Sequence, residues 1–133
     1  MTQIWCNGQW LPSARYPGAG QDRGTLFGLG LFETLLALDG LPVFANRHLS
    51  RLRDSGGKLG WSIAFPGFDE IASELLARNR LATGRARLRL TVTGGSGLVN
   101  DLTSGSDHLV CLAAFPAADP PESLAVSLAP WPR

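Results

Sequence analysis

The chain has 133 residues, of which 44% are hydrophobic and 17% are charged, and its mean hydropathy is +0.06. This length and apolar content predict one domain with a hydrophobic core, alone or with a short attachment, whereas apolar runs of only a few residues exclude a membrane-spanning helix. Twelve basic and eleven acidic residues give a formal charge of +1, which predicts no general attraction to nucleic acid or to a membrane surface.

The first 44 residues are expected to form two β-hairpins. Short apolar segments flank Asn-Gly at 7–8, the strongest short hairpin signal, and a loop rich in proline and glycine follows over 12–20. A nearly continuous apolar run over 31–38 ends at Asp-Gly in positions 39–40, which predicts the second hairpin. Only a glutamate and a threonine interrupt this run, so we expect its strand to be covered on both faces.

Two amphipathic helices are expected next. The first begins with Asn46 as its N-cap and leaves His48, Arg51 and Ser55 together on one stripe. Its apolar positions, at three- and four-residue steps, are Leu49, Leu52, Gly56 and Leu59. The apolar positions of the second helix are Phe68, Ile71, Ala72, Leu75 and Leu76. We expect Gly84 to close this second helix.

Two strands follow the helices. Residues 85–93 alternate with period two, which places Arg85, Arg87 and Arg89 on one face of a strand and apolar side chains on the other. After a polar loop, the apolar residues 108–115 predict a buried strand. The order of hairpins, helices and strands predicts an α+β domain, with two helices on one face of a largely antiparallel sheet.

The end of the chain predicts the beginning of a second unit. We expect residues 1–115 to form a small N-terminal domain and the proline-rich residues 116–123 to form a linker. A further strand is expected to start over 124–128. On this interpretation residues 124–133 are the start of a truncated second domain.

The spacing of the motif residues argues against several common kinds of site. The glycine-rich segment 94–97 lacks the Gly-Lys-Ser/Thr ending of a P-loop, and the Gly-Leu-Gly at 28–30 lacks the third glycine of a dinucleotide fingerprint. The histidines and cysteines are scattered, so no metal site is expected, and no elbow motif supports a nucleophilic triad. The stripe of His48, Arg51 and Ser55 is either a solvated helix face or an anion site in which the guanidinium binds a phosphate or carboxylate.

Cysteine and lysine are rare in the chain. Cys6 and Cys111 make no disulfide framework, and we expect both to be reduced core residues.

The N-terminal residues lack the features of a signal peptide, which indicates a cytoplasmic protein. Lys58 is the only lysine, so chemistry that requires a lysine amine must use it or an amine from elsewhere.

Three motifs occur in a characteristic order: Asp22-Arg23-Gly24-x-x-Phe27-Gly28-x-Gly30-x-Phe32-Glu33-Thr34, Asp39-Gly40, and His48-Leu49-x-Arg51-Leu52-x-x-Ser55. This series resembles the N-terminal domain of the class IV (fold type IV) pyridoxal-phosphate aminotransferases and lyases, over almost the whole chain. That family includes branched-chain and D-amino-acid aminotransferases and aminodeoxychorismate lyase. The segment 90–97 is most similar to the lyase and D-amino-acid branches.

The resemblance implies roles for individual residues. Arg51 would contact the cofactor phosphate, and Phe32 would line the substrate side of the pocket. Gly94 stands where relatives have an arginine that can meet a substrate carboxylate, and Arg89 is the candidate for a replacement charge. Leu29 also departs from the aspartate that relatives often carry, so the resemblance does not identify the substrate.

The resemblance also implies an activity for the complete enzyme, with pyridoxal 5′-phosphate as its cofactor. The enzyme would transaminate an amino acid or act as a lyase on 4-amino-4-deoxychorismate, and it would be a homodimer. The family's Schiff-base lysine is expected in the second domain beyond Arg133, and Lys58 is not its substitute. This chain would then hold no catalytic residue and be inactive alone. The alternative is a non-catalytic truncated module with an anion-binding or interaction role.

Overall fold

A computed structural model describes residues 2–18, 20–97 and 107–127, and it confirms the α+β class. The strands are β1 (Gln3–Cys6), β2 (Gln9–Pro12), β3 (Gly30–Leu38), β4 (Leu41–Pro42), β5 (Arg85–Thr93) and β6 (Val110–Pro116). They pair antiparallel in one six-stranded sheet with the order β2-β1-β6-β5-β3-β4. The helical segments are η1 (Ser13–Arg15), α1 (Arg23–Phe27), α2 (Ala45–Lys58) and α3 (Phe68–Arg78).

Both predicted hairpins are present. In the first, the pairing of Cys6 with Gln9 leaves a two-residue turn, and its Asn7 and Gly8 have φ values of 45° and 86°. In the second, Asp39 and Gly40 have φ values of 46° and 79°. Positive φ at both turn residues matches the right-handed twist of the flanking strands, which explains why Asn-Gly and Asp-Gly are found there.

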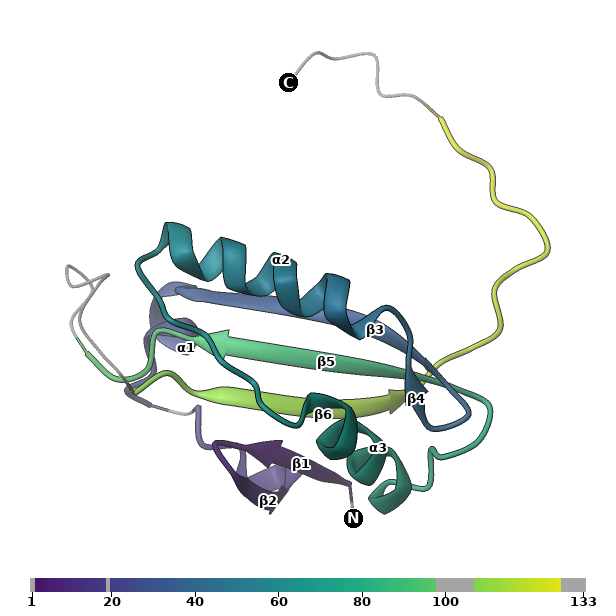
Figure 1. Cartoon of the computed structure of the whole chain (residues 1–133), viewed down its shortest axis with the longest axis horizontal. Helices are drawn as coiled ribbons and strands as arrows, with labels where there is room; N and C mark the ends of the chain where they lie inside the picture. Colours follow the sequence, from purple (N-terminus) through teal and green to yellow (C-terminus); the bar gives the residue numbers. More distant parts are fainter. Residues whose placement is uncertain (1, 19, 98–106, 128–133) are drawn as a thin grey trace.

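The two long helices lie on one face of the sheet, as predicted (Figure 1). Helix α2 packs along β3, and α3 crosses the sheet, where it contacts β4 as well as β1 and β6. Fully buried leucines join the layers: Leu35, Leu52, Leu75, Leu76, Leu88, Leu90 and Leu112. Burial of one such side chain contributes about 1.5–3 kcal/mol, so this layer is the main source of stability.

The prediction that the strand over 31–38 is covered on both faces is wrong. On the helix-facing side of β3, Glu33, Leu35 and Ala37 are buried. On the other side Phe32 is 56% exposed and Leu38 is 39% exposed, because the described helices cover only one face of the sheet. The apolar residues on this side of β3 therefore form an exposed apolar surface, and no second layer of described helices covers them.

Two predicted helix boundaries are also wrong. Helix α2 has Phe44, not Asn46, at its N-cap, because hydrogen bonding of the Val43 N–H to the Leu36 carbonyl holds the chain at the sheet edge just before the helix. Helix α3 ends at Arg78, where the Asn79 side chain binds both the N–H and the carbonyl of Gln3.

Gly84 therefore does not close α3. It has a φ of 73° and lies in the turn before β5, where its N–H donates to Asp39 Oδ1 over 2.8 Å. A glycine suits this position because the backbone is in the left-handed region.

The expectation of two reduced cysteines is wrong as well. Cys6 of β1 and Cys111 of β6 face each other in the antiparallel register, with their Cα atoms 4.2 Å apart, and their sulfur atoms form a disulfide. The pair packs with Ile4 and Leu109 in a small apolar cluster. The strand register explains the bond, because residues that face each other on neighbouring strands have their side chains close together.

The segment after β6 has no regular structure over the residues described, 117–127. The predicted strand over 124–128 is absent at 124–127, and position 128 lies outside the described residues. Leu124 and Val126 are 78% and 87% exposed, and Figure 1 shows this segment running away from the sheet, where no described strand offers hydrogen-bond partners. No helix among the described residues has the length and apolar character needed to cross a bilayer.

Candidate anion-binding site

Strand β3 and helix α2 bring a carboxylate, an imidazole and a guanidinium together. Glu33 lies on the helix-facing side of β3, opposite Leu90 of β5, and only 5% of its side chain is exposed. His48 and Arg51 lie one turn apart on the side of α2 that reaches this position. The buried glutamate is tolerated in the apolar layer because both of its oxygens are hydrogen-bonded to these two residues.

Glu33 holds the Arg51 side chain through two hydrogen bonds. Arg51 Nε donates to Oε1 over 2.7 Å, and Nη2 donates to Oε2 over 2.5 Å. His48 Nδ1 lies 2.7 Å from Oε2, and because an ionised carboxylate only accepts, Nδ1 carries the proton. Arg51 Nη2 is also 3.5 Å from His48 Nδ1, but two donors form no hydrogen bond with each other.

Hydrogen bonding fixes the charge of Glu33. The hydrogen bonds from Arg51 lower the pKa of Glu33 below its ordinary value of 4.5, with a smaller contribution from His48 and against the opposing effect of burial. The same hydrogen bonds raise the pKa of Arg51. Glu33 is therefore a carboxylate, and Arg51 a cation, throughout the neutral range.

This ion pair predicts an acid-sensitive contribution to stability. Since the folded-state pKa of Glu33 lies below the unfolded value, the contribution is complete above about pH 5 and is lost as the pH falls through the folded value. Chemical denaturation of the wild-type chain should show the free energy of unfolding decreasing below pH 4.5. Glu33→Gln should make that decrease shallower, and an identical pH dependence in the two proteins would contradict the assignment.

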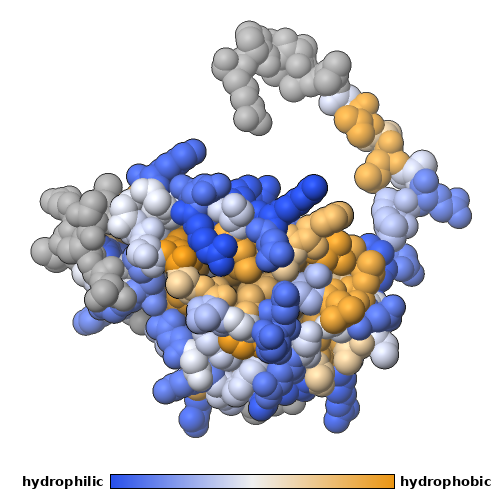
Figure 2. Space-filling view, in the orientation of Figure 1, coloured by the Kyte–Doolittle hydropathy of each residue, from blue (hydrophilic) through white to orange (hydrophobic). Residues whose placement is uncertain are grey.

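Beside the ion pair lies a hollow of about 350 Å³, lined by Phe44, Arg47, His48 and Arg51. Phe44 has a φ of 55° and is 67% exposed, and Arg47 Cζ lies 5.3 Å from the centre of its ring. Figure 2 shows hydrophilic surface along α2 and an apolar area next to it, toward the β4 end of the sheet. Two arginines beside an aromatic ring favour a ligand that carries both an anionic group and a flat apolar part.

The structure separates the predicted site residues into different places. Phe32 and Arg89 contact each other on the open face of the sheet, with Arg89 Cζ 4.0 Å from the centre of the Phe32 ring. Arg51 lies on the helix side, because successive residues of β3 point to opposite faces. The pairing of Phe32 with Arg89 and the pairing of Arg51 with Glu33 are thus on the two sides of one strand.

Gly94 is held by a residue for which no role was predicted. Arg23 is fully buried, and its Nε donates to the Gly94 carbonyl over 3.1 Å, while Nη2 binds the same oxygen. Nε also approaches the Gly95 carbonyl at 3.4 Å. A Cβ at Gly94 would lie 2.8 Å from Leu29 Cδ2, so a side chain there would require that leucine to move. The arginine therefore fixes the path of the chain after β5.

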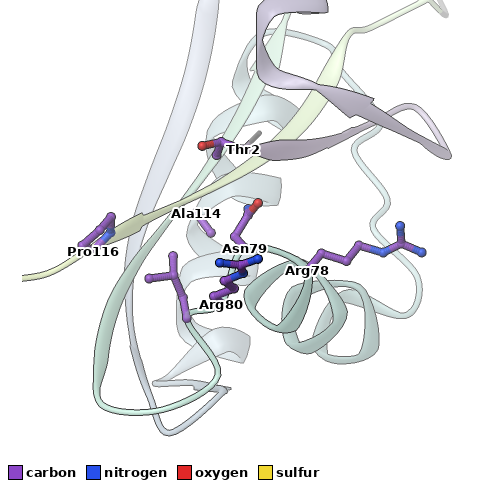
Figure 3. A pocket seen from close by; sticks show the side chains of 7 residues that line it. Thr2, Arg78, Asn79, Arg80, Ala114 and Pro116 are labelled. Atoms are coloured by element: carbon purple, nitrogen blue, oxygen red, sulfur yellow. The ribbon is translucent and has the colours of Figure 1, made fainter.

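A second hollow, of about 370 Å³, lies at the C-terminal end of α3 (Figure 3). Thr2, Asn79, Arg80 and Pro116 are among its lining residues, and Arg78 points away from the others toward the outside. Arg78 pairs with Glu74, and Asn79 binds the backbone of Gln3. We interpret this hollow as a junction between the N-terminal strand and α3, because the Asn79 side chain binds both the N–H and the carbonyl of Gln3 there.

Other predicted features can be placed as well. Lys58 is exposed in the last turn of α2, two helical turns beyond Arg51. The parts of the chain that the structure describes contain no cluster of three or more potential metal-ligating side chains. Sequence reasoning missed Glu33 as the partner of Arg51, although the interruption of an apolar run by a glutamate was a usable signal.

Comparison with known proteins identifies the family. Residues 30–133 match the family model described as amino-transferase class IV. Aminodeoxychorismate lyase of Bacillus subtilis (strain 168) is 28% identical over 94 residues, which cover 69% of this chain and 32% of that protein. A putative branched-chain-amino-acid aminotransferase of Methanocaldococcus jannaschii is 32% identical over 97 residues, covering 71% of this chain and 33% of that protein.

A solved structure supports the fold. A hypothetical aminotransferase from Mycobacterium tuberculosis, in its PLP-bound form, superposes with a TM-score of 0.71 at 23% identity, covering 86% of this chain and 39% of that one. The chain spans about a third of the length of the curated relatives it matches. By its match over residues 30–133, the chain belongs to the class IV aminotransferase family.

Proposed function

We propose that this chain binds the phosphate of pyridoxal 5′-phosphate through Arg51, as the small N-terminal domain of an aminotransferase or a lyase. Family membership supports the cofactor, and the similar M. tuberculosis protein is described in a PLP-bound form. Residues 1–115 would form this domain and 116–123 a linker to a second one. The substrate class is an amino acid or 4-amino-4-deoxychorismate, in keeping with the names of the two curated relatives.

The observation that carries the proposal is the unused edge of Arg51. Its Nε and Nη2 bind Glu33, whereas Nη1 has no hydrogen bond to any residue that the structure describes. Arg47 adds a second positive charge to the same hollow, and both oxygens of the Glu33 carboxylate already accept hydrogen bonds. These groups fit a phosphate, which takes charge-assisted hydrogen bonds from a guanidinium fork.

The other predicted site residues would serve the substrate. Pyridoxal phosphate, when bound, supplies an electron sink for negative charge at the substrate carbon. Phe32 would provide a flat apolar wall, and Arg89, held over that ring, would offer a positive charge to a substrate carboxylate. Gly94 would border the pocket only through its backbone, since Leu29 and Arg23 fill the space beside its Cα. We propose that the lysine amine comes from outside these 133 residues.

Exposed apolar side chains support assembly with further protein. Phe32, Leu41 and Phe44 are 56%, 67% and 67% exposed, which is unusual for large apolar residues. A homodimer of the complete enzyme would place such surface against protein. We include this assembly in the proposal.

Arg51→Gln tests the phosphate contact. Isothermal titration with pyridoxamine 5′-phosphate and with pyridoxamine compares two ligands that differ only in the phosphate and carry no aldehyde to react with Lys58. We expect the wild-type chain to prefer the phosphorylated ligand by about tenfold or more, and Arg51→Gln to remove that preference. Arg53→Gln is the matched control, because Arg53 is exposed on the same helix.

Three outcomes would contradict parts of the proposal. A phosphate preference that survives in Arg51→Gln would remove Arg51 from the site. Equal binding of inorganic phosphate and pyridoxamine 5′-phosphate would favour the alternative, a module that binds small anions. A borohydride-reducible pyridoxal phosphate adduct on Lys58 that turns over substrate would show that the amine is present within the chain.

A further inference from the structure

We propose that Glu33 is a positioning residue, which fixes the direction in which Arg51 presents its guanidinium to a phosphate. This inference rests on the proposed function, since it assumes that Arg51 binds the phosphate. The Glu33 carboxylate is buried, lies behind Arg51 and does not itself touch the ligand.

The geometry of the pair defines which edge of Arg51 remains available. A guanidinium has five N–H groups, and Glu33 accepts from the edge formed by Nε and Nη2. The edge formed by Nη1 and the second N–H of Nη2 then faces away from the carboxylate. A planar fork that is held along one edge can bind a phosphate only along the other, so Glu33 determines the approach of the ligand.

Burial distinguishes this pair from an ordinary surface ion pair. Glu74 and Arg78 also form an ion pair, in which Nε and Nη2 share one carboxylate oxygen, but they are neighbours on one helix, and their side chains are 51% and 39% exposed. Glu33 is 5% exposed and belongs to β3, 18 residues away from Arg51 on α2. The pair therefore anchors a side chain that is itself 68% exposed to a fixed strand of the sheet.

His48 completes the arrangement from the other side. Its Nδ1 donates to the same oxygen of Glu33 that accepts from Arg51 Nη2. The carboxylate is thus held by two side chains of one helix and has little freedom to turn. Loss of the Glu33 charge would leave the Arg51 side chain free to sample other rotamers, and ordering it again on binding would lower the affinity for a phosphate.

The test measures phosphate selectivity in Glu33 variants of the 133-residue chain. We expect Glu33→Gln to lower the affinity for pyridoxamine 5′-phosphate by about tenfold and to leave the affinity for pyridoxamine unchanged. Glu33→Asp, which keeps the charge but shortens the reach, should recover part of the loss. Glu74→Gln removes the matched surface pair and should have no effect.

The double variant Glu33→Gln/Arg51→Gln separates positioning from general damage. If Glu33 acts through Arg51, the double variant should bind pyridoxamine 5′-phosphate no more weakly than Arg51→Gln alone. NMR of the Arg51 Nε–Hε group, recorded without ligand, should show a single slowly exchanging signal in the wild type and fast exchange in Glu33→Gln. Circular dichroism and the thermal midpoint establish that each variant is folded.

The possible failures are distinguishable. Loss of phosphate preference in Arg51→Gln together with wild-type affinity in Glu33→Gln would overturn the positioning role and leave the proposed function intact. Unchanged preference in Arg51→Gln would overturn the proposed function itself. An additional loss in the double variant, beyond that of Arg51→Gln, would show that Glu33 acts on the ligand by another route and would also overturn the inference.

Discussion

Arg23→Met should lower the free energy of unfolding by about 1–3 kcal/mol. The side chain of Arg23 is fully buried and donates to the carbonyls of Gly94 and Gly95. Methionine fills most of the volume but leaves the buried Gly94 carbonyl without its donor, at a cost of about 1–3 kcal/mol. The Gly95 carbonyl keeps the hydrogen bond from the Arg23 backbone N–H, which the substitution does not remove. Urea denaturation of the variant and the wild type, at the same pH, measures the difference.

Besides lowering the stability of the whole domain, Arg23→Met should loosen the backbone at the end of β5. Asp22 caps α1 by accepting from the Thr25 N–H, and it accepts from the Thr93 hydroxyl at the end of β5. The Arg23 N–H donates to the Gly95 carbonyl over 2.8 Å, so the start of α1 and the end of β5 are joined twice. Hydrogen exchange at Gly95 should increase in Arg23→Met, since its N–H is part of this joint. Arg15→Met, at an exposed arginine, is the control and should change stability by less than about 0.5 kcal/mol. Equal stabilities of the two variants would contradict a structural role for Arg23.

The parts of the fold that sequence predicts correctly are those that depend on neighbouring residues. The two turn dipeptides require positive φ, and the alternation in 85–93 fixes which side chains of β5 share a face. The error at 31–38 has a different origin. An apolar run shows that both faces of a strand carry apolar side chains. It does not show whether the second face is covered by helices of the same domain, by another protein surface or by neither.

The candidate site shows the same limit. The motif around His48 and Arg51 pointed to an anion site through a resemblance, while helix periodicity alone favoured a solvated face. The partner of Arg51 comes from β3, and that contact depends on how α2 packs across the sheet. Sequence spacing within one helix carries no information about such a contact between elements.

Reduction of the disulfide should lower the free energy of unfolding by about 2–4 kcal/mol. Cys6 and Cys111 are 105 residues apart, so the bond closes a loop that includes most of the chain. A covalent link over so long a loop restricts the unfolded state strongly, which is where most of its stabilising effect is expected. Denaturation with and without dithiothreitol measures the change, and Cys6→Ala/Cys111→Ala provides the control that should not respond to the reductant.

The disulfide should affect stability without affecting the anion site. The β1–β6 pair that carries it is separated in the sheet by β5 from β3, where Glu33 holds Arg51. The preference for pyridoxamine 5′-phosphate over pyridoxamine should therefore be the same in the oxidised and the reduced protein, provided that both are folded. Two titratable thiols in the folded protein before reduction would contradict the bond. A loss of phosphate preference on reduction would show instead that the β1 end of the sheet and the α2 site are coupled.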